Sequence, residues 1–156
     1  MKKISINRIL FVLHLFVGAG AIAGGLAAIT NPLEPFGMSV VHLKNSPFTN
    51  YFIPGIILFT VLGIGNIISA FTFRFKSKYQ GYISSIFSWA LMIWIVVQCI
   101  MLNDIVILHV IFFIIGLIKA LLSIYILFEH KLFPTNYVID IYYKIKAHYF
   151  HNILKK

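Results

Sequence analysis

The sequence predicts an all-α integral membrane protein, a four-helix bundle, and three observations support this fold class. The chain of 156 residues is 60% hydrophobic, with a mean hydropathy of +0.94. Only 11% of its residues are charged, against about 25% in soluble domains. Its apolar residues form four runs, each near the length of about 20 residues that crosses a bilayer core. A soluble fold of this size could not bury so much apolar surface, so we expect a single membrane domain.

The four predicted spans are separated by prolines, charges and turn-forming residues. We place them at 8–30, 51–73, 81–102 and 105–128. Pro32 and Pro35 end the first span, and Asn103-Asp104 forms a tight turn between the third and the fourth. Residues 1–130 are therefore expected to form the bundle, and residues 131–156 a separate basic tail.

The N-terminal basic residues also resemble the start of a signal peptide. A cleaved signal has an apolar region of roughly 7–15 residues before a small-residue site. Residues 19–28 could contain such a site, but the apolar run continues from Ile9 to about Thr30. We interpret this run as an uncleaved first span.

The distribution of Lys and Arg predicts the orientation. Cytoplasmic loops of membrane proteins carry the excess of these residues. Lys44 falls in the loop 31–50, and Lys119 falls within the fourth span. The other cations fall on one side: Lys2, Lys3, Arg8, Arg74, Lys76, Lys78, Lys131, Lys144, Lys146, Lys155 and Lys156. We expect both termini on the cytoplasmic side of the membrane, with the loop 31–50 outside. The net charge of +9 is explained by this topology, so no nucleic-acid partner is expected.

The loop before the second span carries helix-capping residues and prolines. Asn45 or Ser46 is expected to cap a short helical turn with Pro47 at its first position, where a missing N–H costs nothing. Pro54 is expected to bend the second span or to mark a fresh helix start.

The tail repeats apolar residues at helical spacing from Asn136 onward. One face carries Val138, Ile141, Tyr142, Ile145, Tyr149 and Ile153, and the opposite face carries Asp140, Lys144, Ala147, His151 and Lys155. This pattern predicts an amphipathic helix on the anionic inner leaflet. A frayed basic terminus is the alternative.

Small and polar residues share one face of each span, which indicates where the helices meet. The first span carries His14, Gly18, Ala21, Gly25 and Ala28 on that face; the others carry Gly63, Asn66 and Ala70, then Gly81, Ser84, Ser88 and Gln98, then His109, Gly116, Lys119 and Ser123. The expected bundle therefore has a partly polar interior.

Four of these inward residues are candidates for ligand binding: Gln98, His109, Asn66 and Lys119. Gln98 and His109 are equally distant from the 103–104 turn, so we expect them to approach each other directly or through one water near the outer face. They form either a ligand site or an interhelical hydrogen bond. Lys119 is either a buried functional cation or a side chain that extends to the inner headgroups.

The residues that usually carry catalysis are scattered. The four acids, Glu34, Asp104, Glu129 and Asp140, divide between the two sides of the predicted membrane. The histidines lack metal-ligand spacing, apart from an i, i+3 pair in the basic tail, and Cys99 is the one cysteine. We therefore expect no catalytic residues, no metal, no cofactor and no enzymatic activity.

Four motifs resemble those of a known group: G-A-G-A-I-A-G-G-L at 18–26, N-S-P-F-T-N-Y-F-I-P-G at 45–55, R-F-K at 74–76 and W-I-V-V-Q at 94–98. Together they are similar to a widespread family of small four-span bacterial membrane proteins with an SPF-x5-PG motif before the second span. The resemblance covers about residues 8–125 and implies the fold and orientation only. Asn50 stands where that pattern usually has Asp.

Two functions fit these observations. The first is a non-enzymatic bundle that acts through membrane-protein partners or self-association. The alternative is a protein that binds or transports a small hydrophobic or weakly polar molecule in an outward-facing cavity. A cavity lined by the candidate residues would favour binding, whereas a filled interior would favour the structural role.

Overall fold

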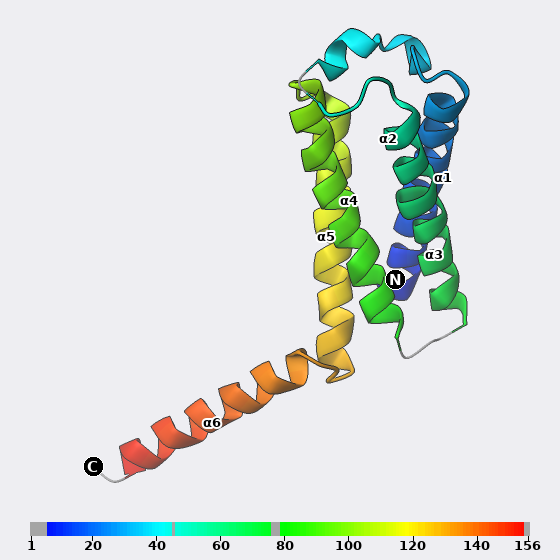
Figure 1. Cartoon of the computed structure of the whole chain (residues 1–156). Helices are drawn as coiled ribbons and strands as arrows, with labels where there is room; N and C mark the ends of the chain where they lie inside the picture. The colour runs from blue at the N-terminus through cyan, green and yellow to red at the C-terminus, as the bar shows by residue number, and fades with distance from the viewer. Residues whose placement is uncertain (1–5, 45, 76–78, 155–156) are drawn as a thin grey trace. The chain divides into compact units, whose positions relative to one another are not determined.

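The computed structural model describes residues 6–44, 46–75 and 79–154, with side chains described up to residue 146 (Figure 1). Several features named above lie outside the described residues: the cap at Asn45, the side chains of Ala147, Tyr149, His151 and Ile153, and the cations Lys2, Lys3, Lys76, Lys78, Lys155 and Lys156.

Every regular element of the described residues is helical. The order is α1 (Ile6–Thr30), η1 (Pro35–Gly37), η2 (Val40–Leu43), α2 (Phe52–Ile57), η3 (Leu58–Ile64), α3 (Gly65–Arg74), α4 (Gln80–Leu102), α5 (Ile107–Glu129) and α6 (Thr135–Leu154).

Four helical stretches are long and apolar enough to cross a membrane, and they match the four predicted spans to within two residues at each end. They are Ile6–Thr30, Phe52–Arg74, Gln80–Leu102 and Ile107–Glu129, where the second joins α2, η3 and α3. In each stretch, at most 39% of the most apolar 18-residue segment is buried within the protein. Because the remaining surface is largely apolar side chains, these helices suit a lipid environment.

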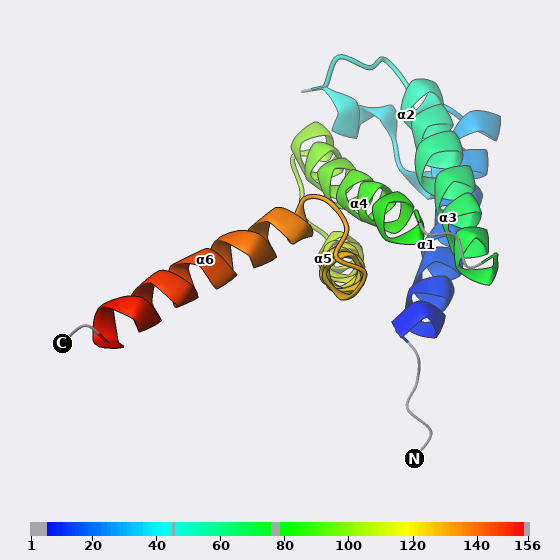
Figure 2. The same cartoon turned by 90° about the horizontal axis from the view of Figure 1, so that it is seen from below.

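The chain divides into two compact units, Met1–Ser123 and Ile124–Lys156, with the division inside α5. The first unit holds α1 to α4 and most of α5. We call the end of this unit that carries η1, η2 and the α4–α5 turn the loop end (Figures 1 and 2). The start of α1, the end of α3 and the start of α4 lie at the opposite end.

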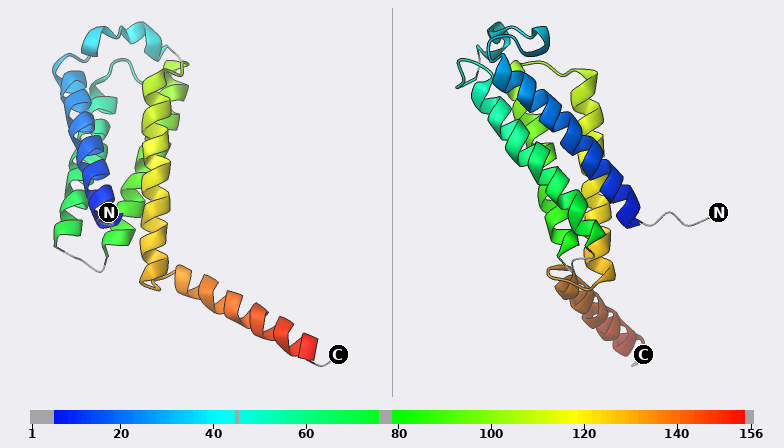
Figure 3. Two further views of the ribbon diagram at one scale, coloured as in Figure 1. Left: turned by 180° about the vertical axis from the view of Figure 1, so that it is seen from behind. Right: turned by 90° about the vertical axis from the view of Figure 1, so that its right-hand side faces the viewer.

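Close contact between α1 and the second stretch organises the first unit, and Figure 3 shows these helices side by side from two directions. A Cβ built on Gly25 would lie 2.7 Å from the backbone nitrogen of Phe59, and one on Gly63 would lie 2.8 Å from Ile22. No side chain fits at such separations, so glycine lets the backbones approach. The predicted contact face of α1 is confirmed, because all five of its residues are buried.

Pro54 marks a fresh helix start, one of the two outcomes predicted for it, because α2 begins at Phe52 after the bends of residues 46–51. Pro54 lies within the first turn of α2, where a backbone N–H has no intrahelical partner, so the proline does not interrupt the helix. The hydrogen bonding instead changes to the π pattern in η3, Leu58–Ile64. A π segment contains an extra residue per turn, and it therefore rotates the faces on either side of it relative to each other.

The predicted helical turn at Ser46 and Pro47 is wrong. Residues 46–51 form bends, and the Ser46 hydroxyl accepts a hydrogen bond from the Phe48 N–H at 3.2 Å. A serine bonded two residues ahead stabilises a turn and needs no helix. The short helices of this loop lie earlier, in η1 and η2, and Ser39 caps η2 by accepting from the Val41 N–H.

The second unit contains the end of α5 and α6. The predicted tail helix is present, and its first residue, Thr135, donates to the Leu127 carbonyl oxygen at 2.8 Å. Val138, Ile141 and Ile145 on its apolar face are each more than half exposed. The association of this face with a membrane stays a prediction.

Candidate functional site

Two regions of the first unit hold the candidate residues. One is a buried group of hydrogen-bonded side chains, here called the polar cluster, which comprises His14, Asn66, Ser69, Ser84, Lys119 and Ser123. The other is a cavity at the loop end. The polar cluster contains two of the four predicted site residues, Asn66 and Lys119.

Asn66 is the centre of the polar cluster. Its Nδ2 donates to the Leu62 carbonyl oxygen at 2.7 Å, so its Oδ1 is the acceptor for its other neighbours. This oxygen accepts from His14 Nδ1 at 2.7 Å and from Lys119 Nζ at 2.6 Å. All hydrogen-bonding positions of the amide oxygen are thus used, and α1, α3 and α5 are joined at one atom.

Serine hydroxyls extend the cluster to α4. The Ser84 Oγ lies 2.7 Å from His14 Nε2 and 2.6 Å from Ser123 Oγ, while the Ser123 hydroxyl also lies 2.7 Å from the Lys119 carbonyl oxygen. Ser69 lies 3.3 Å from His14 Nε2. Buried polar groups are costly without partners, and here each has at least one.

The interpretation of Lys119 as a side chain extending to the headgroups is wrong. Lys119 is 0% exposed, and its Nζ is bonded to Asn66. No ion pair with a carboxylate is formed by Lys119 among the described residues, in agreement with the absence of acids from the spans. Asn66 lies within reach of the lysine, so an amide oxygen satisfies Nζ inside the bundle.

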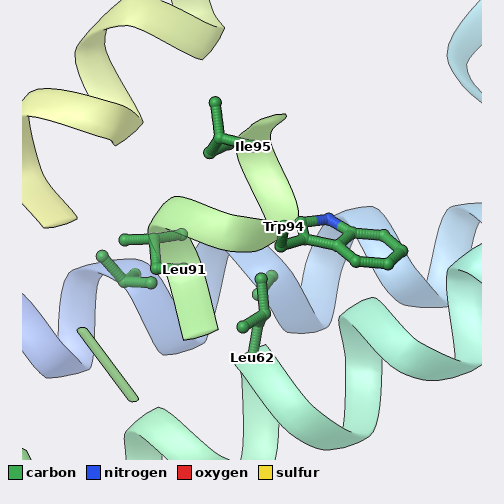
Figure 4. Close-up of a cluster of buried hydrophobic side chains, with 6 residues drawn as sticks. Leu62, Leu91, Trp94 and Ile95 are labelled. Atoms are coloured by element: carbon green, nitrogen blue, oxygen red, sulfur yellow. The ribbon is translucent and has the colours of Figure 1, made fainter. Parts of the chain in front are cut away.

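Apolar side chains separate the cluster from the cavity. Val17, Leu62 and Leu91 are at most 3% exposed, and they form the floor of the cavity. Val17 and Leu62 lie one helical turn from the cluster residues His14 and Asn66. Figure 4 shows Leu62 and Leu91 with Trp94 and Ile95 in this apolar group. The floor keeps the cluster from contact with the cavity.

The cavity has a volume of about 410 Å³. Its walls come from α1, α2, η3, α4, α5 and the loop, and most lining residues are apolar. The side chains in the wall that carry polar groups are His42, Tyr51, Trp94, Gln98, Asp104 and His109. The cavity therefore combines a mostly apolar surface with a few polar groups at one end, as small-molecule sites do.

The loop closes this end of the unit through Tyr51. Its hydroxyl donates to the Ser39 carbonyl oxygen at 3.2 Å, and its backbone N–H donates to the Pro32 carbonyl oxygen at 2.9 Å. Burial raises the pKa of the Tyr51 phenol. The phenol stays neutral at physiological pH and holds the loop over the cavity as a donor.

Gln98 and His109 both line the cavity, as the sequence predicted for its outer polar layer. No direct hydrogen bond joins them in the part of the chain that the structure describes. His109 Nδ1 instead accepts from the Val106 N–H at 3.4 Å, at the start of α5. The direct hydrogen bond between Gln98 and His109 is thus absent, whereas their predicted position in the same part of the interior is confirmed.

The structure separates the four candidates into two pairs. Gln98 and His109 line the cavity, while Asn66 and Lys119 lie in the polar cluster and are absent from the cavity wall. Sequence reasoning did not assign Trp94, which precedes Gln98 by one helical turn and therefore shares its face. Its Nε1 is buried and has no hydrogen-bond partner among the described residues.

Reactive groups do not converge on the cavity. Ser84 and His14 have the separation of a nucleophile and its base, but both are fully buried in the polar cluster. Within the described ranges, no three His, Cys, Asp or Glu side chains are arranged to hold a metal ion. The chemistry that the cavity offers is apolar contact and hydrogen bonding.

No family model, curated protein or solved structure matches the chain.

Proposed function

We propose that this protein binds a small, largely apolar molecule in the loop-end cavity. The cavity itself is the observation that supports this function. A bundle with only a structural role favours a filled interior, whereas this one encloses about 410 Å³ at one end. Volumes of roughly 300–1,000 Å³ with apolar walls are typical of small-molecule sites.

The proposed setting is a bacterial cytoplasmic membrane, crossed four times with both termini in the cytoplasm. The distribution of Lys and Arg supports this orientation, and it places the loop end on the outer side. In the same proposal, α6 lies on the inner leaflet, and the lipid bilayer is a partner of the protein. Membership in the small four-span bacterial family that the chain resembles is part of this proposal.

Non-enzymatic action through partners or self-association was the first expectation from sequence. Because of the cavity, we now place ligand binding before that structural role. The proposed binding protein is still not an enzyme. Transport would need a second opening, and Val17, Leu62 and Leu91 close the floor. We therefore place binding before transport.

Tryptophan fluorescence tests the proposed site. The chain has two tryptophans: Trp94 lines the cavity, and Trp89 is 49% exposed outside it. Trp89→Phe leaves Trp94 as the reporter. In lipid nanodiscs, the neutral apolar dye N-phenyl-1-naphthylamine should accept energy from Trp94 in a saturable manner, with one dye per protein.

Two controls make this experiment specific. Trp94→Phe, which keeps Trp89, should still show saturable transfer, because Trp89 lies five residues, about 7.5 Å of helical rise, from position 94 and is within energy-transfer range of the cavity. Gly20→Leu should block binding, because a Cβ on Gly20 fits at 3.6 Å from Phe112 and the rest of the side chain would fill the cavity. Ala23→Leu, at an exposed position of α1 outside the cavity, is the matched substitution. Equal saturation in all four proteins, or none in Trp89→Phe, would contradict the proposed function.

A further inference from the structure

We propose that the ligand carries a neutral hydrogen-bond acceptor, of the carbonyl oxygen class, bound by Gln98 and His109. The inference rests on the proposed function and names the ligand class of the same cavity. Its basis is the donor geometry at the loop end and the sign of the charges in the wall.

His109 presents a donor to the cavity. The ring is 7% exposed, and Nδ1 accepts from the Val106 N–H at 3.4 Å. A neutral imidazole with Nδ1 as acceptor carries its proton on Nε2. No hydrogen-bond partner of Nε2 occurs among the described residues. The start of α5 therefore fixes both the tautomer and the position of an N–H group that lacks an acceptor.

Gln98 supplies a second unbonded group. Its side chain is half-buried in the cavity wall and makes no hydrogen bond to any described residue. The amide offers two N–H donors and one acceptor. Gln98 lies four residues before the end of α4, His109 lies two residues after the start of α5, and both line the same cavity. One oxygen atom with two lone pairs can accept from both.

The charges of the wall select against an anion. No Lys or Arg is among the residues that line the cavity, and the one carboxylate there is Asp104. A ligand carboxylate would be desolvated without a cation and would be repelled by Asp104. An apolar ketone, aldehyde, ester or quinone satisfies the two donors without this cost.

Competition between matched ligands tests the inference. Trp89→Phe protein in nanodiscs is loaded with the naphthylamine dye and titrated with 2-undecanone, undecane, undecanoate or undecylamine, each expressed as mole fraction in the lipid. We expect 2-undecanone to displace the dye at about tenfold lower mole fraction than undecane, since two hydrogen bonds at roughly 0.5–1.5 kcal/mol each bring such a preference. Undecanoate should be weaker than the ketone by at least about tenfold.

Substitutions test which residues cause the preference for the ketone over the alkane and the carboxylate. In the same background, Gln98→Leu and His109→Leu should each reduce the preference for ketone over alkane by about threefold. Gln80→Leu, the same change on the same helix but outside the cavity, should leave it unchanged. Asp104→Asn should strengthen undecanoate binding relative to that of the ketone. Dye affinity in each variant verifies that the cavity is intact.

The outcomes separate the two proposals. If the dye binds saturably but the ketone is no better than undecane, or undecanoate or undecylamine displaces it best, the carbonyl assignment is wrong and the proposed function stands. If energy transfer to the dye does not saturate in Trp89→Phe protein, the proposed function is wrong, and so is the ligand class that rests on it.

Discussion

The two halves of the first unit use similar side chains in opposite ways. In the polar cluster, Asn66 and His14 are fully buried and bonded to each other. At the loop end, Gln98 and His109 also project inward, yet they line an open space without bonding to each other. The difference lies in what surrounds them. His14 of α1 and Lys119 of α5 lie within 3 Å of the Asn66 amide oxygen, whereas Gln98 faces a cavity. An inward amide supports the fold when protein partners lie within hydrogen-bonding distance. When no such partner is near, the amide is available to a ligand.

The largest effect should come from Asn66→Leu. This change leaves both Lys119 Nζ and His14 Nδ1 without their acceptor. Each stranded buried donor costs about 1–3 kcal/mol, so we expect the free energy of unfolding to fall by about 3 kcal/mol or more. Thermal unfolding in detergent, followed by circular dichroism, measures this loss.

Asn66→Asp is the matched control, because it retains an acceptor for both donors and adds a carboxylate for Lys119. It should be clearly more stable than Asn66→Leu. Equal losses in the two variants would show that the packing of the side chain, and not its hydrogen bonds, determines stability in the cluster.

A smaller effect of opposite sign is expected for Lys119→Met. The methionine removes a buried amine whose one side-chain partner is Asn66. Asn66 Oδ1 still accepts from His14, so no acceptor is stranded. Because replacing a buried charged group with an apolar side chain of similar volume is often neutral or stabilising, we expect a gain of about 1 kcal/mol in the same unfolding assay. A loss similar to that of Asn66→Leu would mean that the amine is required for the cluster.

The smallest effect on stability should be that of Gln98→Leu. Its side chain makes no hydrogen bond to the described residues, and changes that break no specific interaction usually lie within about 0.5 kcal/mol. The free energy of unfolding without ligand should therefore be unaltered, in contrast to Asn66→Leu. A loss above about 2 kcal/mol would indicate that Gln98 supports the fold, and the distinction between the two halves would fail.

Hydropathy and residue spacing were sufficient to predict the helices of the bundle. Hydropathy placed the four long helices to within two residues at each end, because a lipid-exposed helix must be apolar over a fixed length. The spacing of small and polar residues identified the buried face of α1 from His14 to Ala28. The turn at Asn103 also predicted that Gln98 and His109 lie near each other at the outer face, and both line the same cavity.

Which of these inward residues are in contact could not be predicted from their spacing. Lys119 and Asn66 are 53 residues apart, and their contact depends on how α3 and α5 rotate about their axes. The π segment at Leu58–Ile64 sets that rotation for α3, and local propensity gives no signal for it. The cavity likewise arises from the distance between helices, which side-chain volumes on several elements fix together. Periodicity specifies the face of a helix, whereas the partner and the space left between faces depend on the packing of the whole unit.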